Sequence, residues 1–145
     1  KKNSGVYEVY VESYNNPNFS IEVLIKSLNV ARISLFDKPI GYGFNNYNFA
    51  HKKYIKQITL ENIHIGKVNI FDGASNFSKI ITEFGILGVF FLLYLGYFFI
   101  KNKKDDPINI FVISVLVLQL IRGVGYFNGG FMLFMILSYY LLKKT

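Results

Sequence analysis

Hydrophobic and polar residues are distributed unevenly along the chain, and the pattern changes near residue 80. Residues 1–79 mix apolar, polar and basic positions, whereas residues 80–145 are almost continuously apolar, with short polar interruptions. The length and period of apolar runs are the main sequence signal of secondary structure. We therefore predict two parts: a water-facing segment over 1–79 and a membrane-spanning helical bundle over 80–145.

The clearest element of the first part is a helix over residues 20–36. Its apolar residues recur at steps of three and four, which predicts one apolar helix face. That face consists of Ile21, Leu24, Ile25, Leu28, Ala31 and Leu35. Because Glu22, Lys26 and Arg32 lie in the same stretch, the helix is predicted to be amphipathic rather than spanning. Its apolar face is expected to pack on a helix bundle or on the outer membrane surface.

The rest of the first part shows weaker patterns. Residues 6–13 alternate loosely and are compatible with a short strand. Residues 40–47 are rich in Gly and Asn, which is typical of a loop. Residues 48–70 are polar and basic with scattered aromatics, and we expect irregular structure or short helices there. Residues 1–79 are therefore predicted to be mainly a long irregular outer loop around one helix.

Three apolar runs make up the second part. The first, residues 84–100, has no charge over 17 residues, and residues 80–83 extend it to the roughly 20 residues that cross a bilayer core of about 30 Å. The runs at 108–121 and 131–142 are shorter, and each is completed by residues of the Gly-rich segment 122–130. The predicted fold is an all-α integral membrane protein with crossings at about 80–100, 108–123 and 127–142.

The basic residues support an orientation for these crossings. The net charge is +7, and 14 of the 16 basic residues are Lys. The Lys residues at 101–104 and 143–144 flank apolar runs, and short basic loops stay in the cytoplasm. We therefore place residues 1–79 outside and the C-terminus inside. A start without Met and without an apolar signal segment suggests that further membrane helices precede the chain.

Composition disfavours several classes of site. The chain has no Cys, so thiolate metal sites and disulfides are excluded. His51 and His64 lack metal-ligand spacing, and we expect neither a metal nor another cofactor. Gly41 and Gly43 stand outside any βαβ unit, so a tight turn is favoured over a dinucleotide motif. No basic stripe with interleaved aromatics indicates a nucleic-acid partner.

Arg32 and Arg122 are the two Arg residues of a chain that otherwise uses Lys. A guanidinium group offers planar, bidentate donors that suit phosphate, so the pair is a candidate anion clamp. Arg122 is equally compatible with an interfacial anchor, and Arg32 with a solvated surface charge. Glu83 lies one turn inside the first predicted crossing, where it is either a helix-start carboxylate or a site residue.

Several segments together resemble a known family. In order along the chain they are Arg32, residues 37–43 (DKPIGYG), 74–79 (ASNFSK), 83–88 (EFGILG) and 122–127 (RGVGYF). This order, with three crossings after a large outer segment, resembles the C-terminal part of the O-antigen polymerase (Wzy-like) and O-antigen ligase superfamily. The resemblance covers about residues 32–143, without the loop between the second and third segments.

The resemblance implies a multi-pass inner-membrane glycosyltransferase that works without a metal on the periplasmic face. Its donor would be a polyprenyl-diphosphate-linked oligosaccharide, and its other partners would be membrane lipid and other polysaccharide-assembly proteins. Arg32 and Arg122 would stabilise the leaving diphosphate. The group that activates the acceptor is left open among Asp72, His64, His51 and Glu83. The candidates for substrate binding are Gly41, Gly43, His64, Asn76 and Tyr126, of which Asn76 is equally a simple helix cap.

One departure from the family pattern separates two activities. Ligases typically have a His just before the Asn that precedes the Glu-x-Gly helix, and residues 71–76 (FDGASN) contain none. This favours a polymerase of oligosaccharide repeat units, with an O-antigen ligase-like transferase to the lipid A core as the alternative. A non-catalytic membrane transporter or accessory fragment is a third hypothesis.

Overall fold

The computed structural model describes residues 19–58, 65–101, 107–123, 125–126 and 128–143. Apart from turns and two short 3-10 segments, these residues form helices, and no strand occurs among them. The helices are α2 (Phe19–Asp37), α3 (Tyr47–Tyr54), α4 (Asn76–Lys101), α5 (Pro107–Arg122) and α6 (Gly129–Lys143), with 3-10 turns at Ile55–Gln57 and Ile65–Lys67. The predicted strand at 6–13 lies outside the described residues.

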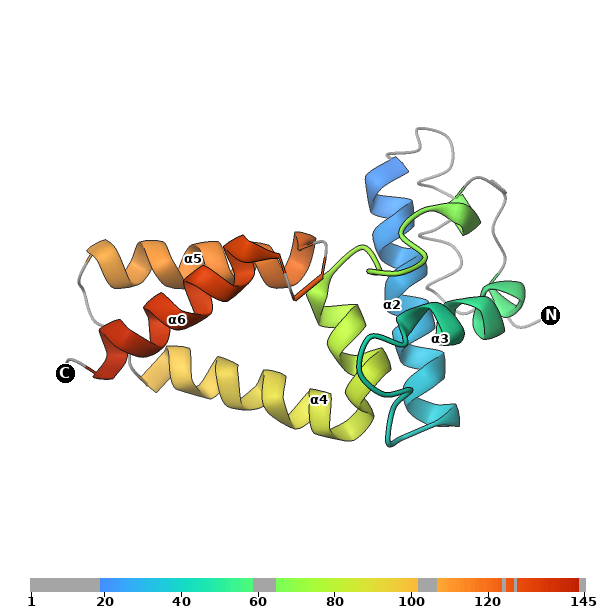
Figure 1. The fold of residues 1–145 in the computed structure, drawn as a ribbon, viewed down its shortest axis with the longest axis horizontal. Helices are drawn as coiled ribbons and strands as arrows, with labels where there is room; N and C mark the ends of the chain where they lie inside the picture. Colours follow the sequence, from blue (N-terminus) through green and yellow to red (C-terminus); the bar gives the residue numbers. More distant parts are fainter. Residues whose placement is uncertain (1–18, 59–64, 102–106, 124, 127, 144–145) are drawn as a thin grey trace.

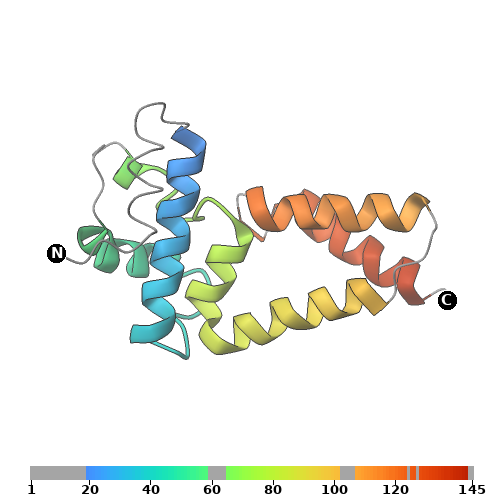
Figure 2. The same cartoon turned by 180° about the vertical axis from the view of Figure 1, so that it is seen from behind.

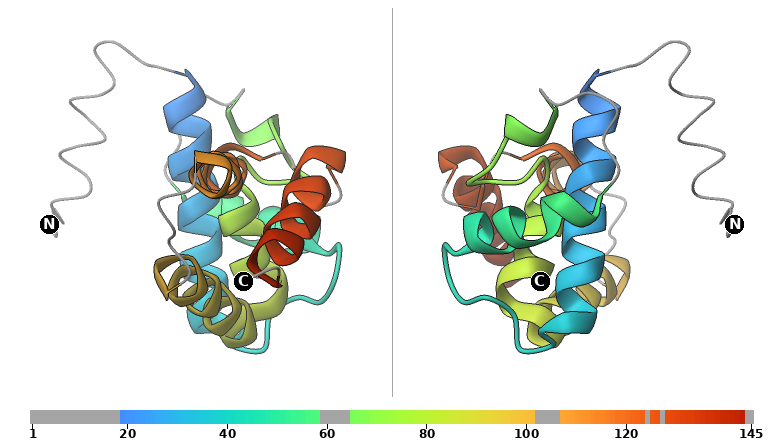
Figure 3. Two further views of the ribbon diagram at one scale, coloured as in Figure 1. Left: turned by 90° about the vertical axis from the view of Figure 1, so that its left-hand side faces the viewer. Right: turned by 90° about the vertical axis from the view of Figure 1, so that its right-hand side faces the viewer.

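The helices form two groups along the long axis of the molecule (Figures 1 and 2). One group consists of α5, α6 and the C-terminal part of α4, which run along that axis. The other group contains α2, which crosses the axis at a steep angle, together with α3 and the start of α4. Viewed along the axis, α2 lies on one side of the start of α4 and α6 lies on the other (Figure 3).

A bend at Gly85 divides α4 into a first limb (residues 76–84) and a second limb (residues 86–101). Gly85 has φ 57° and ψ −132°, which no helical residue adopts. The loop that follows α2 fills the bend. The carbonyl of Pro39 accepts the N–H of Ile86 at 2.8 Å, and the N–H groups of Tyr42 and Gly43 donate to the carbonyls of Thr82 and Glu83. The loop therefore satisfies the backbone groups that the break leaves open.

Two glycines allow the loop and the bend to approach each other. A Cβ at Gly85 would lie 1.9 Å from the carbonyl oxygen of Pro39, and a Cβ at Gly41 would lie 2.3 Å from that of Glu83. Both residues also have positive φ. Only glycine combines this conformation with this backbone contact, so the pair fixes how the loop seats on α4.

The predicted bounds of the first helix agree with α2 to within one residue, but only part of its predicted apolar face is buried. Ala31 is buried, whereas Ile21 and Leu28 are exposed. The inward side is mixed and carries Glu22, Val23, Lys26, Ser27, Val30, Ala31 and Ser34. The reason lies in the partner, because α2 packs on the first limb of α4, whose buried side is also polar.

The small polar side chains on the buried sides of α2 and α4 have hydrogen-bond partners within their own helices. The Ser27 and Ser34 hydroxyls donate to carbonyls one turn earlier in α2, at 2.8 and 2.9 Å. Thr82 does the same in α4. Hydroxyls that bond to carbonyls of their own helix keep their donors paired when they are buried, so these polar side chains can lie on the packed sides of α2 and α4.

The group formed by α5, α6 and the C-terminal part of α4 packs around a small apolar core and exposes much of its remaining apolar surface. The core residues are Ile80, Val112, Leu116, Tyr126 and Phe131. Of the helices described, only α4 is long and apolar enough to cross a membrane, with a mean hydropathy of 2.0; α5 and residues 129–140 are shorter apolar helices. Because only 22% of that α4 window is buried in the molecule, α4 is unlike the core helix of a soluble protein.

Candidate functional site

The Glu83 carboxylate joins three segments at the end of the molecule where α4 begins. It is 1% exposed. One oxygen accepts the N–H of Asn45 at 2.9 Å and the hydroxyl of Tyr126, and the other accepts the N–H of Tyr47 at 3.0 Å. These partners come from the loop after α2, the start of α3 and the α5–α6 connection. The hydrogen bonds that Glu83 accepts therefore hold these three segments against the first limb.

Lys79 lies one turn before Glu83 and is also buried. Its ammonium group is 3.0 Å from the Asp72 carboxylate and 3.9 Å from that of Glu83. It also donates to the carbonyl of Phe71 at 3.2 Å and lies 5.1 Å from the centre of the Tyr126 ring. Two carboxylates and a carbonyl dipole thus balance one buried cation, as a buried charge requires.

Tyr126 completes this cluster as a donor. Burial, and then its hydrogen bond to the Glu83 carboxylate, raise the pKa of the Tyr126 hydroxyl. Both causes favour the neutral phenol, so at ordinary pH the Tyr126 hydroxyl keeps its proton and donates it in the hydrogen bond to Glu83. The ring of Tyr126 also packs against Phe84 and Phe44, so it links the polar cluster to the apolar side of the bend.

Asp72 is the carboxylate of this cluster that reaches solvent. Its side chain is 48% exposed, whereas that of Glu83 is fully buried. Gly125, which has φ +99°, lies beside it, and a Cβ there would be 3.1 Å from Asp72 Oδ1. The structure therefore brings Asp72, Glu83 and Tyr126 together around Lys79, and Asp72 is the carboxylate of this cluster that is open to solvent.

Arg122 is the last residue of α5 and lies at the same end of the molecule. It is exposed and lines a pocket of about 250 Å³. The other residues of the pocket are Phe19, Ser20, Val23, Val68, Asn69 and Ala74. Since residues 68–74 contain Asp72, this pocket lies on the segment that carries the exposed carboxylate.

Arg32 lies outside that pocket. It is exposed on α2, nine residues beyond Val23, which corresponds to roughly 14 Å along the helix axis. The structure does not bring the two guanidinium groups to one pocket. The predicted two-arginine clamp therefore does not form at this pocket. An anion-binding role for Arg122 alone stays a prediction, and Arg32 lies on the exposed face of α2.

Asn76 is fully buried at the start of α4. Its side-chain amide donates to the carbonyl of Gln119 at 3.1 Å, and a Cβ at Gly123 would lie 2.3 Å from the same amide nitrogen. Asn76 thus binds the C-terminal end of α5. The N-cap role at α4 belongs to Ser75, whose Oγ accepts the N–H of Ser78 at 3.1 Å.

The remaining candidates have different surroundings. Gly41 and Gly43 form the tight turn with positive φ that their spacing predicts, and Gly41 is buried against α4. His51 is 2% exposed in α3, and burial, followed by the charge of Lys26, lowers its pKa to about 4. His64 lies outside the described residues.

Sequence reasoning gave Lys79 no role, although its position was informative. Lys79 and Glu83 are four residues apart, a spacing that places oppositely charged side chains on one helix face. Elsewhere in the described residues, no group of three or more His, Asp or Glu side chains could hold a metal ion. No protein-family model, curated protein or solved structure matches the chain.

Proposed function

We propose that the chain is the C-terminal part of a bacterial inner-membrane enzyme that polymerises polyprenyl-diphosphate-linked oligosaccharide repeat units. The first support is the surface of the second limb of α4, α5 and α6. Large apolar side chains stand exposed along all three helices, including Leu93, Phe111 and Ile136. Soluble monomers rarely expose such continuous apolar area, and hydrocarbon suits it.

The second support is the position of the polar cluster. Lys79 and Glu83 lie in the first limb of α4, and Arg122 and Tyr126 lie where α5 ends. Lys101 lies at the opposite end of α4. With the short basic segments in the cytoplasm, the cluster comes to the outer surface, where a lipid-linked donor would present its diphosphate.

The proposal rests on the half-exposed carboxylate of Asp72 and on the exposed guanidinium of Arg122, whose pocket is lined by Val68, Asn69 and Ala74 of the segment that carries Asp72. Asp72 takes the proton of the acceptor hydroxyl, whose oxygen attacks the anomeric carbon of the donor glycan. The bond from that carbon to the diphosphate oxygen breaks, and the diphosphate leaves with the electron pair. Arg122 stabilises the charge of the leaving group. Lys79 and Glu83 position Asp72 and are not themselves in contact with substrate.

The test uses the protein in its own host, with surface polysaccharide separated on a gel and membrane levels measured by blotting. We expect Asp72→Asn and Arg122→Ala to abolish the ladder while single repeat units still appear. Asp37→Asn is the matched control, because the Asp37 side chain is 47% exposed and also ion-paired to a lysine. A normal ladder in both D72N and R122A at normal protein levels would contradict the proposed site.

The same gel separates two other functions. Loss of all glycan from the lipid A core, instead of loss of the ladder alone, would indicate the ligase-like alternative. A non-catalytic membrane protein also has an observation in its favour: Glu83 and Lys79 satisfy each other internally, as a purely structural cluster does. In that case both variants would leave the polysaccharide unchanged.

A further inference from the structure

Four large apolar side chains project around the bend of α4 without cover from the described part of the chain. We call them the ledge: Phe36, Ile40, Ile86 and Leu87, which are 79%, 83%, 48% and 70% exposed. Two belong to the end of α2 and its loop, and two begin the second limb. Side chains this large are usually at least partly buried in a folded domain.

The ledge is one surface because a backbone contact joins its two halves. The Pro39 carbonyl accepts the N–H of Ile86 at 2.8 Å, which places Ile40 beside the start of the second limb. The C-terminal end of α2, the loop after it and the bend of α4 lie at the same end of the molecule in opposite views (Figures 1 and 2).

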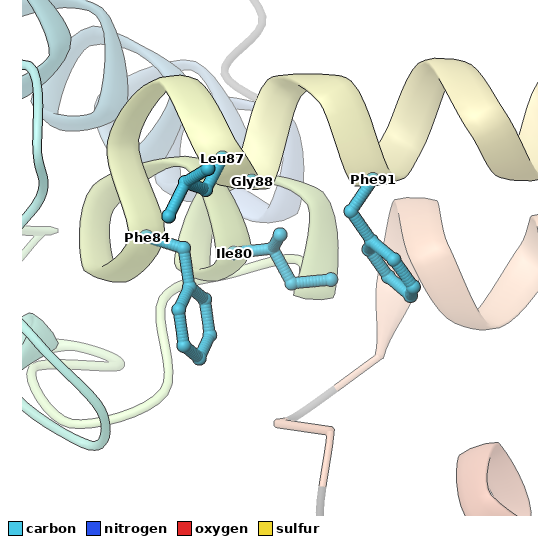
Figure 4. A pocket seen from close by; sticks show the side chains of 5 residues that line it. All are labelled: Ile80, Phe84, Leu87, Gly88 and Phe91. Carbon is cyan, nitrogen blue, oxygen red and sulfur yellow. The ribbon is translucent and has the colours of Figure 1, made fainter.

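The ledge continues into apolar surface on the second limb. Leu87 also lines an apolar pocket of about 300 Å³ with Ile80, Phe84, Gly88 and Phe91. Figure 4 shows Ile80 on the first limb and Phe91 on the second, on either side of this space. Leu87 thus belongs both to the ledge and to the apolar surface of the second limb.

The charges that border the ledge are positive. Arg32 and Lys38 are exposed next to it. The neighbouring acid, Asp37, is paired with Lys53 at 2.6 Å, so it does not offset them. An apolar surface bordered by cations matches the boundary between acyl chains and anionic phosphates in a bilayer.

We propose that the ledge inserts at the acyl–headgroup boundary of the outer leaflet, with Arg32 and Lys38 among the lipid phosphates. This proposal rests on the membrane location of the second limb given above. The ledge sets the depth at which the bend of α4 lies, and so holds the Glu83–Lys79 cluster at the membrane surface. This gives Arg32 a function separate from that of Arg122.

The absence of Trp from the sequence allows a direct test with single-Trp variants of the 145-residue chain. The probes are Phe36→Trp and Ile40→Trp. Phe90→Trp, on the exposed side of the second limb, is the membrane control, and Phe49→Trp, on the exposed side of α3, is the aqueous control. Each variant is reconstituted in phosphatidylcholine–phosphatidylglycerol vesicles whose acyl chains carry bromine near the glycerol.

We expect brominated lipid to quench the F36W, I40W and F90W variants, and aqueous iodide to quench mainly F49W. Quenching of F90W by lipid while F36W and I40W behave like F49W would overturn the ledge and leave the membrane location intact. Failure of lipid to quench F90W would overturn both. Because the four variants change exposed aromatic or aliphatic side chains, circular dichroism should show equal helix content in all of them.

Discussion

The two limbs of α4 belong to one helix but are buried in opposite ways. The first limb carries mostly polar residues on its buried side, among them Asn76, Lys79 and Glu83. The second limb is apolar, yet Phe90 and Leu93 project from the molecule. In a water-soluble domain the apolar limb would be the buried one. The contrast teaches that specific polar contacts order the first limb, while the surroundings of the second limb decide its stability.

The largest effect is expected where the limbs meet. Gly85→Ala forces a side chain onto a backbone with φ 57°, which alone costs about 1–3 kcal/mol, and it also collides with the Pro39 carbonyl. Together these should prevent the folded state from accumulating. Thermal unfolding in detergent measures the loss. Gly96→Ala is the control, since no atom lies within 4 Å of a Cβ there; equal behaviour of the two variants would refute the role of the bend.

The next largest effect is expected from removal of the Glu83 carboxylate in the first limb. Glu83→Ala leaves two backbone N–H groups and a hydroxyl without their acceptor and removes one of the two carboxylates beside the buried Lys79. We expect this to lower the free energy of unfolding by about 3–5 kcal/mol. Glu83→Gln keeps one acceptor oxygen and should lose less. Asp37→Ala, which removes an acid in a solvent-exposed ion pair, should change the free energy of unfolding little. Denaturant unfolding that ranks E83A with D37A would show that the cluster is not structural.

The second limb should respond to charge instead. Leu93→Lys places an ammonium group near the middle of the limb, where insertion into a bilayer becomes less favourable by about 2.5–3.5 kcal/mol. A membrane-insertion assay measures the shift. Phe49→Lys, at an exposed residue of α3, should insert normally. If L93K inserts as well as the parent chain, the second limb does not face lipid.

The smallest effect is a pH dependence of stability that arises from His51 in α3. The pKa of His51 is about 4 in the folded state and about 6.5 when unfolded. As pH falls from about 6.5 towards 4, the unfolded state binds a proton that the folded state does not, and stability declines by about 2–3 kcal/mol. His51→Gln should lack this part of the decline in stability between about pH 6.5 and 4. The measurement is the unfolding midpoint of the parent chain and of the H51Q variant between pH 7 and 4. If the two midpoints fall in parallel, the burial of His51 is contradicted.

The sequence predicted the helices better than their faces. Helix periodicity placed α2 within one residue, and the predicted crossings near 80–100, 108–123 and 127–142 match the helical segments of α4, α5 and α6 to within a few residues. Periodicity indicates which side of a helix is apolar, but burial depends on the partner. Here α2 packs on a polar limb, so its buried side includes Ser27 and Ser34, while Ile21 and Leu28 of its apolar face are exposed.

The site was predictable as a set of residues but not as an arrangement. Asp72, Glu83 and Tyr126 were all candidates, yet their meeting depends on the bend at Gly85, and a glycine within an apolar run does not reveal its φ. Lys79 was missed because a lysine at the start of an apolar helix resembles an ordinary interfacial charge. Its spacing from Glu83 was the available signal.

The contact between Gly41 and Gly85 has a consequence for how variants of this chain can arise. Each residue meets the backbone of the other's segment, not its side chain, so no second substitution can make room for the first. The two positions cannot covary by exchanging size, as packed side chains do. In a random double-mutant library, a substitution at Gly41 should therefore never be rescued by a substitution at Gly85, or the reverse. Each position should keep glycine whatever residue stands at the other.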